Sequence, residues 1–388
     1  MLTSITLENF RSFGAKQTVP LSPITVLVGP NNSGKSSFMS VGKFVRQIVE
    51  TIDVGAELDS PDMKRRVFHR PPEGDPVLGL AWSADKARYS TRVKMDSLLP
   101  VTEELVDPAG RTPWGPPAEL ERLTTVSGQR VIGGTINKLQ KLAVAPGLGW
   151  PEIEPFGGLR AVWAHARQDP AARLLAPLAT SRDVKLALAS LRADAPFATK
   201  PVLGEDGAGM AAVLSLWRGA NPERSEQLDE ALRRSLPEIR HALVQPAPEG
   251  KKYRLWFQQL DGEQFDAEQI SDGVLFFTGL LMHVLDAEPG SVVFIEEPEQ
   301  SIHPRRLTEV VDLLRHMVQE RGCQFVVATH APALLNEFRD EPEALLLFRR
   351  GEHGTQVTPL SDAPKLVEAL DKVNPGEMLA DGFFNDPI

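Results

Sequence analysis

The chain has 388 residues, of which 42% are hydrophobic and 24% charged, with a formal net charge of −10 and one cysteine. This length allows one large or two modest domains with a substantial core. A single cysteine excludes a disulfide framework, and the acidic balance disfavours non-specific DNA binding by the whole surface. Small basic clusters at residues 64–70 and 305–306 leave nucleic-acid binding on one face open.

Neither a membrane span nor a secretory leader is expected. No run of about 18 apolar residues occurs, and no charged n-region precedes an apolar h-region at the N-terminus. We therefore expect a cytoplasmic protein without membrane contact.

A phosphate-binding loop is the first functional pattern along the chain. Residues 24–28 form an apolar run that predicts a buried strand, and residues 36–49 carry apolar side chains at helical spacing. Between them, residues 29–36 read G-P-N-N-S-G-K-S, a complete G-x-x-x-x-G-K-[ST] pattern. In a strand–turn–helix unit of this kind, backbone N–H groups cradle nucleotide phosphates. The candidate nucleotide-binding residues are Gly29, Pro30, Asn31, Asn32, Ser33, Gly34, Lys35, Ser36 and Ser37.

Two residues of this loop have predicted roles in phosphate chemistry. Lys35 is expected to reach the β- and γ-phosphates, and Ser36 to place its hydroxyl on Mg²⁺. The loop therefore predicts a nucleoside triphosphate and Mg²⁺ as ligands, and the resemblance described below implies that the nucleotide is ATP.

The middle of the chain predicts a β-subdomain followed by a helical insert. Residues 76–82, 88–95 and 101–106 alternate as antiparallel strands do, and residues 108–118 form a linker rich in proline and glycine. Helical patterns broken by prolines follow, the clearest at residues 184–192 and 225–235. No heptad repeat persists, so no long coiled coil is expected. The predicted division is 1–118 and 246–388 for the two parts of a nucleotide-binding head, which the resemblance described below implies is an ATPase head, and 119–245 for a mostly helical insert.

A polar turn before a buried helix is the next candidate site. A strand is predicted at residues 253–259, and Ser271, Asp272 and Gly273 then precede an apolar helix at residues 274–285. Ser271 suits a helix N-cap with Asp272 in the first turn. These three residues form either a helix cap alone or an anion-binding helix N-terminus that is presented to a second nucleotide.

Two later strands end in side chains suited to phosphoryl transfer. Residues 291–295 predict a strand that ends in E-E-P-E. We assign Glu296 to Mg²⁺, together with Ser36, and Glu297 to activation of the attacking water. Residues 325–328 predict a strand before His330, which is either a sensor of the γ-phosphate or a structural hydrogen-bonding residue.

This set of motifs resembles the ABC-type P-loop ATPase heads of the RecF, SMC and OLD-like group. The resembling segments are residues 5–13 (N-F-R-S-F turn), 29–36 (Walker A), 204–214, 271–273 (signature), 296–304 (Walker B and D-loop) and 329–332 (switch histidine). Glu296 replaces the usual Asp, and Asp272 replaces the first signature Gly. No confident Q-loop glutamine is found, and Gln129 and Gln168 are the candidates.

The resemblance implies an α/β head with a mixed central sheet flanked by helices, a small antiparallel β-subdomain and the helical insert. It also implies a homodimer that sandwiches two ATP molecules, with Walker A and B of one chain facing residues 271–273 of the other. Hydrolysis would control a partner effector in phage defence or genome maintenance.

Three other functions compete with this interpretation. The main alternative is a RecF-like DNA-binding clamp with slow ATPase activity. A nucleotide-binding scaffold without turnover and a transporter ATPase subunit fit the motifs less well. No D-x-D pair of a nuclease domain occurs, so we expect no cleavage of nucleic acid.

Overall fold

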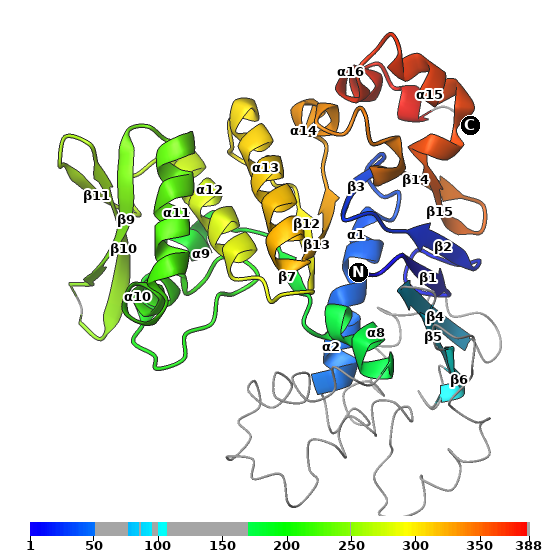
Figure 1. Cartoon of the computed structure of the whole chain (residues 1–388), viewed down its shortest axis with the longest axis horizontal. Helices are drawn as coiled ribbons and strands as arrows, with labels where there is room; N and C mark the ends of the chain where they lie inside the picture. Colours follow the sequence, from blue (N-terminus) through cyan, green and yellow to red (C-terminus); the bar gives the residue numbers. More distant parts are fainter. Residues whose placement is uncertain (51–76, 85–86, 95–99, 107–169, 249, 386–388) are drawn as a thin grey trace, which may run out of the picture.

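The computed structural model describes residues 1–50, 77–84, 87–94, 100–106, 170–248 and 250–385 (Figure 1). The strands are β1 (Ser4–Glu8), β2 (Gln17–Pro20), β3 (Ile24–Val28), β4 (Val77–Ala84), β5 (Ala87–Lys94), β6 (Pro100–Val106), β7 (Arg182–Val184), β8 (Ala195–Pro196), β9 (Ile239–Pro246), β10 (Lys252–Gln259), β11 (Gln264–Asp266), β12 (Val292–Glu296), β13 (Gln324–Ala328), β14 (Leu345–Gly351) and β15 (Gly354–Pro359). The α-helices are α1 (Lys35–Met39), α2 (Val41–Glu50), α8 (Pro170–Ala179), α9 (Leu188–Arg192), α10 (Met210–Ala220), α11 (Pro222–Ser235), α12 (Asp272–Leu285), α13 (Pro304–Arg321), α14 (Pro332–Asn336), α15 (Pro364–Leu370) and α16 (Pro375–Ala380). Short 3₁₀ helices lie at Pro342–Ala344, Leu360–Asp362 and Phe383–Asn385.

A mixed central sheet carries the predicted phosphate loop. Its strand order is β15-β14-β3-β13-β12-β7, parallel except for the edge strand β15. Strands β3 and β13 are buried along their whole length, as expected for parallel strands covered on both faces. Because β3, β12 and β13 are parallel, their carboxyl ends meet at one edge of the sheet.

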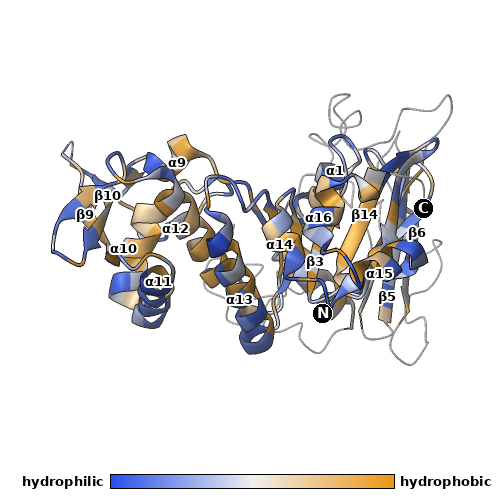
Figure 2. Cartoon of the chain, turned by 90° about the horizontal axis from the view of Figure 1, so that it is seen from above, coloured by the Kyte–Doolittle hydropathy of each residue, from blue (hydrophilic) through white to orange (hydrophobic). Residues whose placement is uncertain are grey.

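Alternate residues of the central strands enter two different cores. In β12, Val293 and Ile295 belong to the core shared with α12 and α13, whereas Val292 and Phe294 belong to the core shared with α1 and α2. This period of two is what a strand with two covered faces requires. The sheet is therefore held between two helical layers, and Figure 2 shows β14 and β3 as apolar strands inside the molecule.

The predicted β-subdomain is present as an antiparallel sheet of order β2-β1-β4-β5-β6. It packs on the second core through Ile5, Leu7, Leu78 and Leu80. The predicted α/β class, with a mixed central sheet flanked by helices and a small antiparallel β-subdomain, is confirmed.

A helical lobe lies at the other end of the molecule (Figure 1). Helices α9–α12 pack there with a small sheet in which β10 pairs with β8, β9 and β11. Helix α12 is buried from Val274 to Leu285, as its apolar sequence predicts. Helix α13 begins with Pro304. His303 caps this end, because its ring Nδ1 accepts a hydrogen bond from the Arg305 N–H. Gly322 caps the other end of the helix, after Arg321.

The segment predicted as a mostly helical insert also contributes strands. Within its described part, β7 is an edge strand of the central sheet, in register with β12 through Val184 and Ile295. The helix predicted at residues 184–192 is therefore wrong at its start and begins at Leu188. The helix predicted at 225–235 is confirmed within α11. The domain boundaries at 118 and 245 remain a prediction.

The helix predicted after the phosphate loop is divided. Ser40 separates α1 from α2, and its hydroxyl donates a hydrogen bond of 2.7 Å to the Ser37 carbonyl oxygen. The linker at 108–118, Gln129, Gln168 and the basic cluster at 64–70 lie outside the described residues. Within the part of the chain that the structure describes, no helix is long and apolar enough to cross a bilayer.

Candidate nucleotide-binding site

A cavity of about 220 Å³ lies at the carboxyl edge of β3, β12 and β13. We call it the nucleotide cavity. Its lining combines the phosphate loop with side chains that follow the neighbouring strands: Ser12, Asn31, Asn32, Ser33, Gly34, Lys35, Ser36, Ser37, Glu296, Glu297, Ala328 and His330. The structure thus brings together candidate residues that are nearly 300 positions apart in the sequence. Of the predicted loop residues, only Gly29 and Pro30 are not part of this lining.

The loop backbone accepts only glycine at two of its positions. Gly29 and Gly34 have φ angles of 150° and 109°, which disfavour residues with a side chain. A Cβ atom at Gly29 would collide with the Phe348 carbonyl oxygen, and one at Gly34 with the Thr355 hydroxyl. The β14–β15 hairpin therefore forms the wall behind the loop.

Lys35 is held inside the loop. Its side chain nitrogen Nζ donates hydrogen bonds of 2.6 Å to the Gly29 carbonyl oxygen and 3.0 Å to that of Pro30. Burial lowers the pKa of Lys35, and the charge of Glu297 acts in the opposite direction. A bound nucleotide would offer this ammonium anionic phosphate oxygens in place of neutral carbonyl oxygens, and the opposite charge of the phosphate adds to the attraction.

Glu296 at the end of β12 is paired with a lysine that sequence reasoning missed. Lys185 follows β7, and its Nζ lies 2.7 Å from Glu296 Oε2. The hydrogen bond and the charge of Glu296 raise the pKa of Lys185. The parallel register of Val184 with Ile295 places the two side chains side by side. The sequence offered no signal for this pair, because residues 184–192 have a helical pattern.

Glu297 adopts a left-handed backbone conformation with φ of 49°. Its N–H donates a hydrogen bond of 2.8 Å to the Ala328 carbonyl oxygen, which fixes the chain at the end of β12. The side chain is exposed and faces the nucleotide cavity. Non-glycine residues in this conformation are uncommon and cluster at functional sites. This geometry supports the role predicted for Glu297.

Glu299 holds the loop that carries His330. Its carboxylate accepts hydrogen bonds of 2.8 Å from the Thr329 hydroxyl and 2.7 Å from the His330 N–H. Burial, followed by the nearby charge of Lys35, lowers the pKa of His330, and the charges of Glu299 and Glu297 act in the opposite direction. Glu299 therefore positions the loop that carries His330, a role that the E-E-P-E sequence alone did not reveal.

The structure does not bring the signature residues into the nucleotide cavity of the same chain. Ser271 precedes α12 without a side-chain cap bond, and Asp272 Oδ1 accepts a 2.7 Å hydrogen bond from Arg192 Nη2. Gly273 lies so close to the Ser301 carbonyl oxygen that a Cβ atom would touch it. Both Ser271 and Asp272 are exposed. They are thus accessible to another molecule.

The residues assigned to Mg²⁺ have the right chemistry for it. The Ser36 hydroxyl and the Glu296 carboxylate both line the nucleotide cavity and are hard oxygen donors. Among the described residues, no group of three or more His, Cys, Asp or Glu side chains is arranged to hold a metal. Mg²⁺ is usually bound by one or two protein oxygens together with substrate phosphates. The donors present fit that mode.

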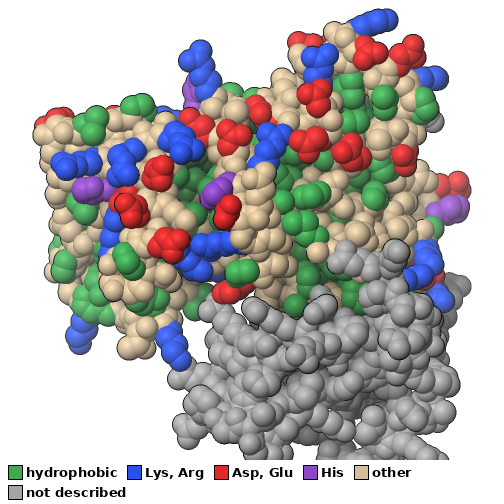
Figure 3. All heavy atoms as spheres, in the orientation of Figure 1, with side chains coloured by type: hydrophobic (Ala, Val, Ile, Leu, Met, Phe, Trp, Pro, Cys, Tyr) green, Lys and Arg blue, Asp and Glu red, His purple; other side chains and the backbone are tan. Residues whose placement is uncertain are grey.

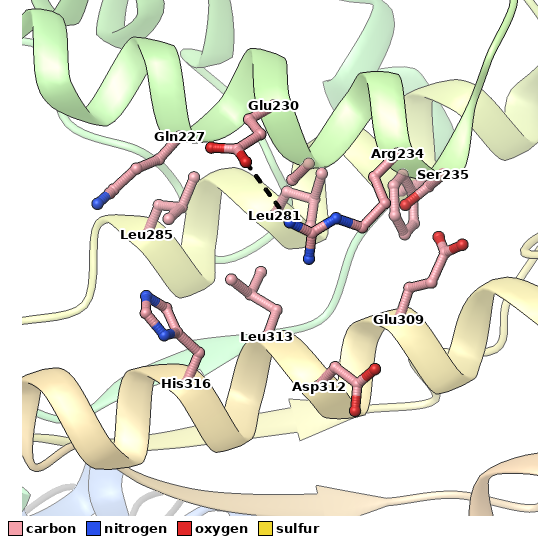
Figure 4. Close-up of a pocket in the computed structure, with 12 residues that line it drawn as sticks. Gln227, Glu230, Arg234, Ser235, Leu281, Leu285, Glu309, Asp312, Leu313 and His316 are labelled. Carbon is pink, nitrogen blue, oxygen red and sulfur yellow. Dashed lines mark ion pairs between the residues drawn. The ribbon is translucent and has the colours of Figure 1, made fainter.

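A second hollow, of about 310 Å³, lies in the helical lobe between α11, α12 and α13. Figure 4 shows Leu281 and Leu285 beneath polar side chains, with Glu230 and Arg234 paired at 3.5 Å. Figure 3 shows acidic and basic side chains intermixed over the face that carries these helices. Although it is larger than the nucleotide cavity, this hollow contains none of the predicted site residues.

Fold and site together define a P-loop ATPase. The chain belongs to the family described as "AAA domain, putative AbiEii toxin, Type IV TA system", whose model matches residues 24–132 and 186–336. A second model, described as "AAA ATPase domain", matches residues 1–44. The predicted class of ATPase is thereby confirmed.

Several solved SMC head structures are similar to the chain. An SMC head bound to the C-winged helix domain of ScpA is 14% identical, with 92% of this chain and 97% of that chain covered and a TM-score of 0.49. A Pyrococcus furiosus SMC head bound to the C-terminal domain of ScpA is 14% identical, with 96% and 99% covered and a TM-score of 0.48. The Thermotoga maritima SMC head is 13% identical, with 92% and 98% covered and a TM-score of 0.45. Such scores do not establish activity or partners. No curated protein matches the chain.

Proposed function

We propose that the chain is a Mg²⁺-dependent ATPase that acts as an ATP-gated dimeric switch. One observation carries the proposal: a single cavity gathers the phosphate loop, Glu296, Glu297 and His330, while the signature residues lie outside it. Each chain therefore holds the two halves of a composite ATP site at different places on its surface.

The cavity supports hydrolysis of the γ-phosphate. Lys35 and the loop N–H groups would bind the β- and γ-phosphates, and Ser36 with Glu296 would hold Mg²⁺, which supplies charge neutralisation when bound. Glu297 would accept a proton from a water molecule whose oxygen attacks the γ-phosphorus. The bond between that phosphorus and the β–γ bridging oxygen breaks, and ADP and phosphate are released.

The exposed start of α12 supports a homodimer. Backbone N–H groups at a helix N-terminus attract phosphate, and α12 has 14 residues with Ser271 exposed before it. In the dimer, residues 271–273 of one chain would cover the nucleotide of the other. Hydrolysis would then separate the chains and release or engage a partner effector in phage defence or genome maintenance.

Steady-state turnover of Glu297→Gln tests the chemistry. Loss of a positioned base commonly lowers the rate by about 100-fold or more, so we expect this loss with ATP binding retained. Glu343→Gln, an exposed carboxylate away from the cavity, is the matched control. Unchanged turnover of Glu297→Gln would show that Glu297 is not the base. A salt-dependent rise in the wild-type rate on adding DNA would favour the RecF-like clamp.

A further inference from the structure

The hollow of about 310 Å³ in the helical lobe lies over α12, between α11 and α13, and we call it the lobe groove. None of the residues that line it also lines the nucleotide cavity. Ligand clefts typically enclose roughly 300–1,000 Å³. The lobe groove is therefore a separate space of a size that ligands occupy.

The floor of the lobe groove is an apolar stripe on α12. Phe277, Leu281 and Leu285 follow one another at a spacing of four residues, which places them on one face of the helix. At 1.5 Å per residue, the stripe extends over about 12 Å. Leu313 of α13 and Ala231 of α11 border this stripe and keep part of their surface exposed.

The two walls carry polar side chains on either side of this floor. Figure 4 shows those of α11 and those of α13, which are Gln227, Glu230 and Arg234 on the first and Glu309, Asp312 and His316 on the second. With the histidine counted as neutral, three carboxylates stand against one guanidinium, so the walls are acidic. Glu230 pairs with Arg234 at 3.5 Å, and Asp312 lies 3.9 Å from Arg315.

Two polar atoms of the walls are buried without a hydrogen-bond partner among the described residues. They are Oε2 of Glu309 and Oε1 of Gln227, so each wall contributes one. Both oxygens are acceptors, and a buried acceptor without a donor destabilises the structure. The lobe groove therefore lacks donors, above all at the carboxylate of Glu309.

We propose that the lobe groove binds an amphipathic helix of a partner protein, with lysine or arginine beside its apolar face. Charge complementarity carries this choice, because an acidic groove with an apolar floor requires cations and apolar side chains from its occupant. A lysine or arginine of the bound helix donates to Glu309 Oε2. Apolar side chains three or four residues apart lie along Leu281, Leu285 and Leu313, since floor and walls repeat at that same spacing.

This docking site goes beyond the proposed ATPase function and does not depend on nucleotide binding. The lobe groove and the signature residues belong to the same helix, since α12 begins at Asp272 and carries the floor from Phe277 to Leu285. A test without nucleotide therefore gives the same answer whether or not the proposed function holds.

Fluorescence anisotropy of a labelled peptide tests the proposal on the full chain without nucleotide. The probe is an amphipathic helix of about 18 residues made of leucine and lysine, and a companion probe has glutamate in place of lysine. The test variant is Glu309→Gln with Asp312→Asn, which removes two charges of the lobe groove at nearly constant side-chain size. The control is Glu368→Gln with Asp371→Asn, the same change at exposed residues of equal spacing at the end of α15.

A second variant keeps the test independent of the two acidic residues. Ala231→Arg places a cation of the chain itself into the lobe groove from α11. Arginine is a good helix former, so α11 should persist, which circular dichroism checks. The added side chain should exclude the lysine probe.

We expect wild type to bind the lysine probe at least tenfold more tightly than the glutamate probe. The test variant and Ala231→Arg should each bind the lysine probe at least tenfold more weakly than wild type, and the control should match wild type. If the test variant binds like wild type, or if the control loses as much affinity, the lobe groove is not the docking site. If wild type forms a dimer without the probe and the test variant does not, a second copy of the chain covers the groove in place of a partner.

Discussion

The part of the molecule built on the central sheet, with the phosphate loop and the ends of β12 and β13, is called here the nucleotide half. It gathers its candidate residues around a cavity, whereas the helical lobe exposes its candidate residues. In the nucleotide half, Lys35, Glu297 and His330 converge on one cavity at the edge of the central sheet. In the helical lobe, Ser271 and Asp272 lie exposed at the start of α12. The carboxyl ends of parallel strands meet at one edge of the sheet, whereas the start of α12 lies at the surface and is accessible to another molecule.

Under the proposed function, each chain supplies half of a working ATP site. Two ion pairs in the described part of the chain join the nucleotide half and the helical lobe: Lys185 binds Glu296, and Arg192 binds Asp272. Lys185 and Arg192 both belong to the β7–α9 segment, so Glu296 and Asp272 are linked within one chain through 8 residues.

Lys35→Ala should have the largest effect, because it removes the buried cation of the nucleotide half. Charge-assisted hydrogen bonds contribute about 1.5–3 kcal/mol each. Loss of two such bonds between Lys35 and the phosphates should weaken ATP binding by about 100-fold or more. Fluorescence titration of a labelled ATP analogue measures this loss. Lys43→Ala, at a half-exposed lysine on α2, is the matched control. Unaltered binding by Lys35→Ala would refute the phosphate-loop assignment.

Ser271→Arg should affect association and spare nucleotide binding. A bulky cation at the exposed start of α12 blocks contact with a second chain, whereas the nucleotide cavity of the same chain contains no residue of the signature. Light scattering with Mg·ATP should therefore show that Ser271→Arg is a monomer. Ser361→Arg, which changes another exposed serine, is the control and should still dimerise. A dimer of Ser271→Arg would show that the signature does not face the partner's nucleotide.

His283 should make the helical lobe sensitive to acid. Burial and the nearby charge of Arg182 lower the pKa of His283 to about 3, whereas the unfolded chain has the ordinary value of about 6.5. Between these values the unfolded state binds more protons, so stability falls as the pH is lowered, by about 2 kcal/mol between pH 7 and pH 5.

Urea unfolding at both pH values measures the contribution of His283. In His283→Leu, the decrease in the free energy of unfolding between pH 7 and pH 5 should be smaller than in wild type by about 2 kcal/mol. His316→Leu, at an exposed histidine, should show the same decrease as wild type. An equal loss in wild type and His283→Leu would show that this histidine does not couple protonation to folding.

Lys185→Gln should have the smallest effect. The ion pair with Glu296 is exposed on the lysine side, at 75% of the side chain, and such pairs contribute about 0–1 kcal/mol. Lys185 competes with Mg²⁺ for the Glu296 carboxylate. The substitution should therefore lower the Mg²⁺ concentration that half-saturates nucleotide binding by about two- to fivefold. Lys372→Gln, at an exposed residue, provides the comparison. A higher Mg²⁺ requirement in Lys185→Gln would mean that Lys185 supports metal binding instead.

The sequence predicted the nucleotide half well because its motifs are local. The run from Ile24 to Ser36 encodes strand, turn and helix start by periodicity and glycine, and E-E-P-E follows its strand directly. The structure confirms these elements and gathers the side chains predicted there. The residue roles remain predictions that the variants above test.

The contacts that the sequence could not predict join segments far apart in the chain. Thr355 supports the phosphate loop from 322 positions away, and Lys185 reaches Glu296 across 111 positions. No local pattern encodes such pairings, since they depend on strand order in the sheet. The start of the predicted helix at 184 was wrong for the same reason: tertiary pairing with β12 drew Val184 into a strand.

The solution mass of Glu297→Gln, measured by light scattering with and without Mg·ATP, tests directly whether ATP binding joins two chains into a dimer. This variant should bind ATP without turning it over, so the two halves of the composite site stay joined. An ATP-gated dimer requires that the variant be a monomer without nucleotide and a dimer with Mg·ATP. A mass that does not change on adding Mg·ATP, in a variant shown to bind it, would contradict the ATP-gated dimer.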